Sequence, residues 1–191
     1  MNDQYELPGD KHQLEVFMRN QRADFDERSF WLQHSLGSET HWLFIQAYDA
    51  LKLELYLPAC TGFLTGIEAS LRNTMAQMKK TAQFDHVDDI SLLSNSLLRQ
   101  ARANGISIDG LAFPDEQDFE VNLPSRQNVE LVRVRHTLCH GNILEYVSAQ
   151  GDMPSFFTPE CCRDLAIKLD AISRSWVASL GQFRQQVLGL K

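Results

Sequence analysis

One short stretch of the sequence combines a side chain that binds anions with side chains that transfer protons near neutral pH. Arg135 is followed directly by His136, and His140 comes after three more residues, with Gly141 next. Histidine has the side-chain pKa nearest to neutrality, so it can act as a general acid or base. Arginine binds phosphate through paired hydrogen bonds and keeps its charge. The stretch is therefore the strongest candidate in the chain for a chemical site.

A helix over this stretch fixes where the three side chains lie. At about 100° per residue, His136 and His140 lie about 40° apart on one face, whereas Arg135 lies about 140° from His140. The arginine must therefore reach round the helix to share a pocket with the histidines. A single chain supplies few groups for catalysis. Two copies of the chain related by a two-fold axis would place two arginines and two histidines around one cleft.

The motif resembles the RxxxxH motif of the HEPN superfamily, in its fuller form of Arg, a polar residue, three further residues, His and often Gly. An earlier stretch, Gly66–Asn73, is similar to the HEPN helix that lends polar groups to the site. The resemblance implies that Glu68, Arg72 and Asn73 support the site. It also implies an all-α domain that forms homodimers. Many HEPN domains are metal-independent endoribonucleases of toxin–antitoxin and phage-defence systems.

The same resemblance implies the reaction. The ribose 2′-OH of RNA attacks the adjacent phosphorus and leaves a 2′,3′-cyclic phosphate and a 5′-OH. In this scheme His140 is the acid and base, and Arg135 binds the phosphate and offsets the charge of the transition state. His136 contacts the substrate or orients its partners. Because a guanidinium takes the role of a divalent cation, no cofactor and no metal are expected.

Other interpretations of the motif stay open. His136, His140 and Cys139 suggest zinc, but they are an incomplete ligand set unless the adjacent cysteines at 161–162 arrive from another helix. The arginines of the motif are also compatible with ordinary charged side chains on the solvent-exposed face of a helix. In the earlier stretch, Glu68 and Arg72 are compatible with an ordinary ion pair, which stabilises a fold by less than about 1 kcal/mol when exposed.

Composition limits the class of protein. The chain has 191 residues, of which 43% are hydrophobic and 23% charged, enough for a core without disulfides or a metal. Since 18 basic residues face 25 acidic ones, the formal charge is −7, and RNA binding needs a local cationic site. The four cysteines form no CxxC pair, and we find no secretory signal and no long apolar run. We therefore expect reduced thiols, a cytoplasmic location and no membrane segment.

Apolar residues recur at helical spacing over most of the chain. Within the third helix, Gly62 and Gly66 are expected to allow close approach of a neighbour. Residues 104–127 are predicted to form a long loop with a small hairpin before the motif helix. The sum is an all-α, up-and-down bundle of five to six helices, HEPN-like, in a single domain over residues 1–191. Helices are predicted at about 11–36, 38–55, 59–81, 88–103 and 125–145, the last with Gly141 as a kink, and from Thr158 to the C-terminus.

Two functions besides the nuclease are candidates. One is a non-catalytic HEPN-like module that binds RNA, nucleotides or another protein, which the negative net charge favours. The other is a plain helical adaptor with an accidental Arg–His spacing. The loop at 104–127 is expected to border the cleft, and its acids either restrain RNA or contact a neutralising partner such as an antitoxin protein. These acids are Asp115, Glu116, Asp118 and Glu120.

Overall fold

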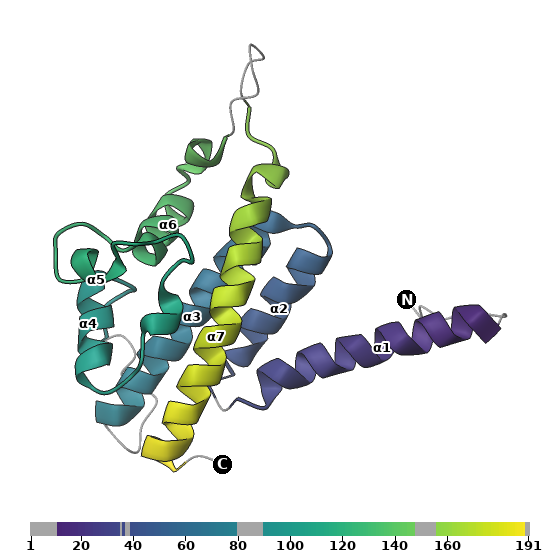
Figure 1. Ribbon diagram of the computed structural model, residues 1–191, viewed down its shortest axis with the longest axis horizontal. Helices are drawn as coiled ribbons and strands as arrows, with labels where there is room; N and C mark the ends of the chain where they lie inside the picture. The colour runs from purple at the N-terminus through teal and green to yellow at the C-terminus, as the bar shows by residue number, and fades with distance from the viewer. Residues whose placement is uncertain (1–10, 35, 37–38, 80–89, 148–155, 190–191) are drawn as a thin grey trace. The chain divides into compact units, whose positions relative to one another are not determined.

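The computed structural model describes residues 11–34, 36, 39–79, 90–147 and 156–189. No strand occurs in these residues, so the predicted all-α class is confirmed. The up-and-down HEPN arrangement stays a prediction. Figure 1 shows the helices, which are α1 (Lys11–Leu32), α2 (His41–Lys52), α3 (Tyr56–Lys79), α4 (Asn95–Ala103), α5 (Phe119–Asn122), α6 (Glu130–Cys139) and α7 (Arg163–Leu188). Short 3-10 turns are η2 (Asp109–Leu111), η3 (Ile143–Tyr146) and η4 (Pro159–Cys162).

The chain divides into two units, residues 1–33 and 34–191. In the first unit, α1 leaves the apolar side chains of Met18 and Phe25 60% and 70% exposed. The second unit contains α2 to α7 and every residue of the predicted site. The prediction of one domain over the whole chain stays a prediction. None of the described helices is both long enough and apolar enough to cross a membrane.

Glycines set the distance between α2 and α3. A Cβ atom at Gly62 would lie 2.8 Å from the Cβ of Ala47, and one at Gly66 would lie 2.9 Å from the ring of Phe44. Both distances are shorter than van der Waals contact, so only glycine permits this approach. The close approach predicted for these two positions is confirmed. Because α2 covers one side of α3, the remaining sides of α3 are left to pack against α6 and α7.

Helix α7 packs along α3 and completes the core of the second unit (Figure 1). Trp176 is fully buried, and its indole Nε1 donates a hydrogen bond of 2.9 Å to the hydroxyl of Ser70. A buried indole needs such a partner, because an unsatisfied donor costs about 1–3 kcal/mol. The contact fixes the rotation of α3 about its axis, and with it the face on which Glu68 lies.

Residues 90–130 form a connected framework rather than a free loop. Helix α4 begins where the Ser94 hydroxyl accepts a hydrogen bond from the Leu97 amide, and the chain turns out of it at Gly105, which has φ +84°. The buried amide of Asn95 then donates to the carbonyl oxygens of residues 122 and 127 and accepts from the backbone of Val129. Asn95 therefore holds the end of the segment against the first turn of α6.

The hairpin predicted within 104–127 is wrong. Ile106 and Ile108 are both buried, but the next residues form the turn η2, which packs against α7, and pair with no strand in the described residues. Phe119 and Val121 lie in a short helix, where Phe119 is buried and Val121 is 67% exposed. The alternating burial at Ile106 and Ile108 thus comes from an extended segment that enters the core. Packing against α7 overrode the hairpin that the alternating sequence predicted.

Most helix boundaries also differ from the prediction. Helix α1 ends at Leu32 rather than 36, α2 spans His41–Lys52 rather than 38–55, α3 begins at Tyr56 rather than 59, and α6 begins at Glu130 rather than 125. The helix predicted at 88–103 begins at Asn95, and residues 88 and 89 lie outside the described part of the chain. The last helix is preceded by η4, whose first residue is Pro159, so the start predicted at Thr158 opens a 3-10 turn before α7 begins at Arg163.

Candidate functional site

The motif helix α6 ends at Cys139, one residue before His140. Gly141 has φ +74°, its amide donates 3.2 Å to the carbonyl of Leu138, and the next amide, that of Asn142, donates 2.9 Å to the carbonyl of Thr137. These two bonds define a Schellman motif, in which the left-handed glycine terminates the helix. The helix predicted to continue to residue 145 with a kink at Gly141 is therefore wrong, because a residue in this conformation ends an α-helix.

His136 and His140 lie together on the exposed surface beside this turn. Their ring centroids are 4.3 Å apart, with 50° between the ring planes. Among the residues that the structure describes, neither ring has a hydrogen-bond partner. The expectation that both histidines share one face is confirmed, and both imidazoles are open to solvent. Their roles as acid, base or substrate contact stay predictions.

Arg135 points toward α3 and pairs with Glu68. Its Nε donates to Glu68 Oε2 over 3.0 Å, and the side chain of Glu68 is only 12% exposed. Arg72 approaches the second carboxylate oxygen, with its Nη1 3.9 Å from Oε1 and its Nε bonded to the carbonyl of Ile90. One largely buried carboxylate is thus shared by two guanidinium groups. Its burial requires such charge partners, because an unpaired carboxylate in this place would be strongly destabilising.

A cavity of about 150 Å³ lies beside this group. Arg135, Arg72 and Glu68 line it, together with Cys139 at the end of α6. The charged residues of this lining are two cations and one anion, so the lining itself favours a small anion over a cation. Neither His136 nor His140 lines it. One copy of the chain therefore brings the arginines and Glu68 together, but it leaves the histidines beside this cavity and not in it.

Asn73 does not join this group. The side chain is 9% exposed on α3, it does not line the cavity, and it has no hydrogen-bond partner within the described part of the chain. The resemblance that suggested Asn73 therefore has no counterpart in the local geometry. Its supporting role stays a prediction.

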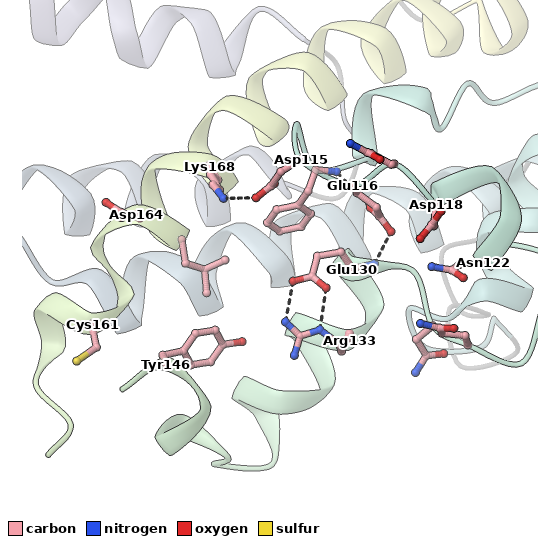
Figure 2. Close-up of a pocket in the computed structure, with 15 residues that line it drawn as sticks. Asp115, Glu116, Asp118, Asn122, Glu130, Arg133, Tyr146, Cys161, Asp164 and Lys168 are labelled. Atoms are coloured by element: carbon pink, nitrogen blue, oxygen red, sulfur yellow. Dashed lines mark hydrogen bonds and ion pairs between the residues drawn. The ribbon is translucent and has the colours of Figure 1, made fainter. Parts of the chain in front are cut away.

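A larger cavity of about 680 Å³ lies on the opposite side of α6, and sequence reasoning missed it (Figure 2). Arg133 faces it, since residues two apart on a helix point about 200° apart. Nε and Nη2 of Arg133 bond to the two oxygens of Glu130, both over 2.7 Å, and Nη1 pairs with Glu145. Glu130 raises the pKa of Arg133, so this guanidinium stays charged. The spacing of Glu130 and Arg133 was one signal in the sequence that pointed to this face of the helix.

Three of the four acids singled out in the loop at 104–127 line this second cavity. They are Asp115, Glu116 and Asp118. The fourth, Glu120, instead pairs with Arg102, with a shortest distance of 2.6 Å. The expectation that the loop borders the cleft of the motif is therefore wrong, because the cavity that it borders is lined by Arg133 and not by Arg135.

The cysteines do not complete a zinc site with the motif histidines. Cys60 and Cys162 are buried together, where the Cys60 thiol donates 3.8 Å to the carbonyl of Cys162 and burial raises the pKa of Cys60. Cys161 contacts the hydroxyl of Thr158. Among the described residues, no three His, Cys, Asp or Glu side chains gather in a way that could hold a metal ion.

Comparisons with family models, with curated proteins and with solved structures find no match to this chain.

Proposed function

We propose that this protein is a metal-independent endoribonuclease of the HEPN type, which cleaves RNA at a site shared by two copies of the chain. The observation that carries the proposal is the position of Arg135, the arginine of the motif, against the buried Glu68 of the supporting helix α3. The two stretches that resemble HEPN motifs are 67 residues apart in sequence, and their charged side chains meet.

Glu68 leaves Arg135 ready to bind phosphate. Only Nε is engaged, so the two terminal nitrogens keep their N–H groups for the oxygens of a phosphate, within the part of the chain that the structure describes. A carboxylate that fixes the guanidinium beforehand reduces the entropy lost on binding. Arg72 adds a second positive charge on the same cavity. These groups would offset the charge that develops on the phosphorane-like transition state.

The exposed histidines supply the proton transfers. One imidazole removes the proton from the ribose 2′-OH as its oxygen attacks phosphorus, and another protonates the 5′ oxygen as the P–O5′ bond breaks. Since His136 and His140 stand outside the arginine cavity of their own chain, a second copy placed across a two-fold axis would bring its histidines to face that cavity. The homodimer is therefore part of the proposal, together with action on cytoplasmic RNA and restraint by an antitoxin protein.

The test is cleavage of RNA by the purified protein in EDTA, with the ends of the products identified. We expect a 2′,3′-cyclic phosphate and a 5′-OH. Loss of His140 to Ala should lower the rate by about 10²–10⁴, the usual contribution of a general acid or base. Arg135→Ala should lower it by about 10²–10³. Arg126→Ala is the matched control, because Arg126 is exposed and has no partner among the described residues. RNA left intact at high protein concentration would overturn the proposal.

A non-catalytic module that binds RNA, nucleotides or a protein is the second candidate. The observations that favour it are the net charge of −7 and the absence of His136 and His140 from the lining of the arginine cavity. It predicts a protein that binds its partner through Arg135 without any cleavage. The same experiment separates the two candidates. If the second candidate is correct, RNA stays intact with every variant, and Arg135→Ala loses the binding.

A further inference from the structure

The cavity of about 680 Å³ beside Arg133 has a composition unlike that of the arginine cavity. It lies between the segment at 113–130, the turn η3 and the first turns of α7 (Figure 2). Phe113, Tyr146 and Leu165 give it apolar walls. Its charged lining comprises five acids against two bases. The acids are Asp115, Glu116, Asp118, Glu130 and Asp164, and the bases are Arg133 and Lys168.

Both bases are already neutralised by carboxylates. Arg133 is held by Glu130 and Glu145, and Lys168 donates 2.8 Å to Asp115. Glu116 accepts hydrogen bonds from two backbone amides, which carry no charge. The cavity therefore keeps an excess of negative charge that no described side chain offsets. A phosphate or an RNA strand is repelled from it, and a cation is attracted.

The remaining carboxylates stand at the two ends of the cavity. Asp118 and Asp164 have no hydrogen-bonding or ionic partner among the described residues. Figure 2 shows them on opposite sides, with the Lys168–Asp115 and Arg133–Glu130 pairs between them. The arrangement offers two separate attachment points for positive charge rather than one.

Tyr146 adds a neutral polar group to the wall. Tyr146 lines the cavity, and its buried hydroxyl oxygen has no hydrogen-bond partner among the described residues. Burial raises the pKa of Tyr146 to about 12, so the hydroxyl stays protonated at neutral pH and its oxygen can accept a hydrogen bond. A buried hydroxyl without a partner is unfavourable by about 1–3 kcal/mol, which a donor from a ligand would relieve.

We propose that this cavity binds a linear organic cation with amino groups at both ends, of the polyamine class. One ammonium group pairs with Asp118 and the other with Asp164, while the methylene chain lies along Leu165 and the face of Tyr146. Aromatic faces and carboxylates are the partners that alkylammonium groups prefer. Two basic side chains of a bound peptide carry the same chemistry. The inference is independent of the proposed nuclease, since it concerns the face of α6 that repels phosphate.

The test is calorimetric titration of the full chain with spermidine at constant ionic strength. We expect binding that Asp118→Asn and Asp164→Asn each weaken about threefold and the double variant about tenfold, as for solvent-accessible ion pairs. Glu15→Gln with Asp26→Asn is the charge-matched control, because both acids are exposed on α1 and have no partner among the described residues. Its affinity should match that of the wild type. Butylamine, with one amino group, should bind at least about tenfold more weakly than spermidine.

Two further arms make the result decisive. Tyr146→Phe removes only an unpaired hydroxyl, so the fold is kept and spermidine should bind about threefold more weakly. A trilysine peptide that binds more tightly than spermidine, with the same dependence on Asp118 and Asp164, assigns the cavity to a basic peptide segment. The proposal is overturned if spermidine gives no heat of binding and no rise in melting temperature. It is equally overturned if the control variant loses as much affinity as the double variant.

Discussion

The two faces of α6 carry arginines two residues apart that differ in how many of their donors are used. On one face, Arg133 bonds to both oxygens of Glu130 and pairs with Glu145, so three of its nitrogens are engaged. On the other face, Arg135 bonds to Glu68 through Nε alone. Both arginines form ion pairs, yet only Arg135 has terminal nitrogens without a partner among the described residues. The number of unused N–H groups, and not the presence of an ion pair, is what distinguishes the two arginines.

The partners differ in origin as well as in number. Glu130 lies three residues from Arg133 on the same helix, and its side chain is 32% exposed. Glu68 comes from α3, 67 residues away, and its side chain is 12% exposed. A local, solvated pair contributes little to stability, whereas a carboxylate buried between two arginines cannot lose its charge partners without a large penalty. Substitutions on the two faces should therefore have unequal effects.

Conversion of each arginine to lysine gives the largest contrast. Arg135→Lys keeps the charge but loses the paired donors that fit a phosphate, so we expect the rate of RNA cleavage to fall about 10²-fold. Arg133→Lys should lower that rate less than about threefold, because its donors serve Glu130 and Glu145. Initial rates on a labelled RNA in EDTA measure both. Equal losses in the two variants would contradict the assignment of the phosphate to the Arg135 face.

Neutralisation of each glutamate tests the same contrast through stability. Glu68→Gln leaves two guanidinium groups beside an uncharged amide, and we expect the free energy of unfolding to fall by about 2 kcal/mol. Glu130→Gln should lower it by less than about 1 kcal/mol. Urea denaturation followed by circular dichroism gives both values. If the order were reversed, Glu68 would not be the buried partner on which the Arg135 face depends.

The helices were predictable where local chemistry determines them. Pro58 stands in the first turn of α3, where proline is tolerated, and Gly105, at φ +84°, follows the end of α4, where glycine commonly terminates a helix. The segment at 104–127 was not predictable, since the burial of Ile106 and Ile108 depends on a turn that packs against α7. Alternating apolar residues specify which side chains are buried, but not whether a second strand lies beside them.

The candidate site was also predictable only in part. The spacing of Glu68 and Arg72 and the resemblance of Gly66–Asn73 pointed to a charged group on α3, and Arg135 meets that group. The pairing of Arg133 with Glu145 could not be read in advance. It depends on Gly141, which ends α6 and returns the chain so that Glu145 also accepts a hydrogen bond from Thr137. Contacts made after a reversal of the chain carry no periodic signal.

Gly141 offers a smaller effect, which tests the turn that brings Glu145 to Arg133. A Cβ at this position meets no atom within 4 Å, so the strain of an alanine arises from φ +74° alone. We expect Gly141→Ala to lower the free energy of unfolding by about 1–2 kcal/mol, the difference for an L-residue in the left-handed region. Gly141→Asn should lower it less, because asparagine tolerates that region. Urea denaturation of both variants decides, and an alanine variant as stable as the wild type would show that the turn does not need its left-handed residue.

The smallest effect is a shift in the titration of Tyr146, which reports the charge balance around Arg133. Burial raises the pKa of Tyr146 to about 12, and the charge of Arg133 opposes that rise while the charge of Glu130 supports it. If Glu130 neutralises Arg133, then Glu130→Gln should lower the pKa of Tyr146. The difference in tyrosinate absorbance between each protein and its Tyr146→Phe version isolates this group from the other tyrosines. An unchanged pKa in Glu130→Gln would mean that the pair is not closed in solution.

The raised pKa of Tyr146 also determines how the free energy of unfolding changes at high pH. Between the ordinary tyrosine value of 10.0 and about 12, the folded protein keeps the proton of Tyr146 while the unfolded chain releases it. The stabilisation is therefore complete below pH 10 and is lost as the pH rises through that window. Tyr146→Phe removes this contribution, so its free energy of unfolding should fall less steeply with pH than that of the wild type. Parallel slopes for the two proteins would place the Tyr146 hydroxyl in water rather than buried beside the cavity lined by Arg133.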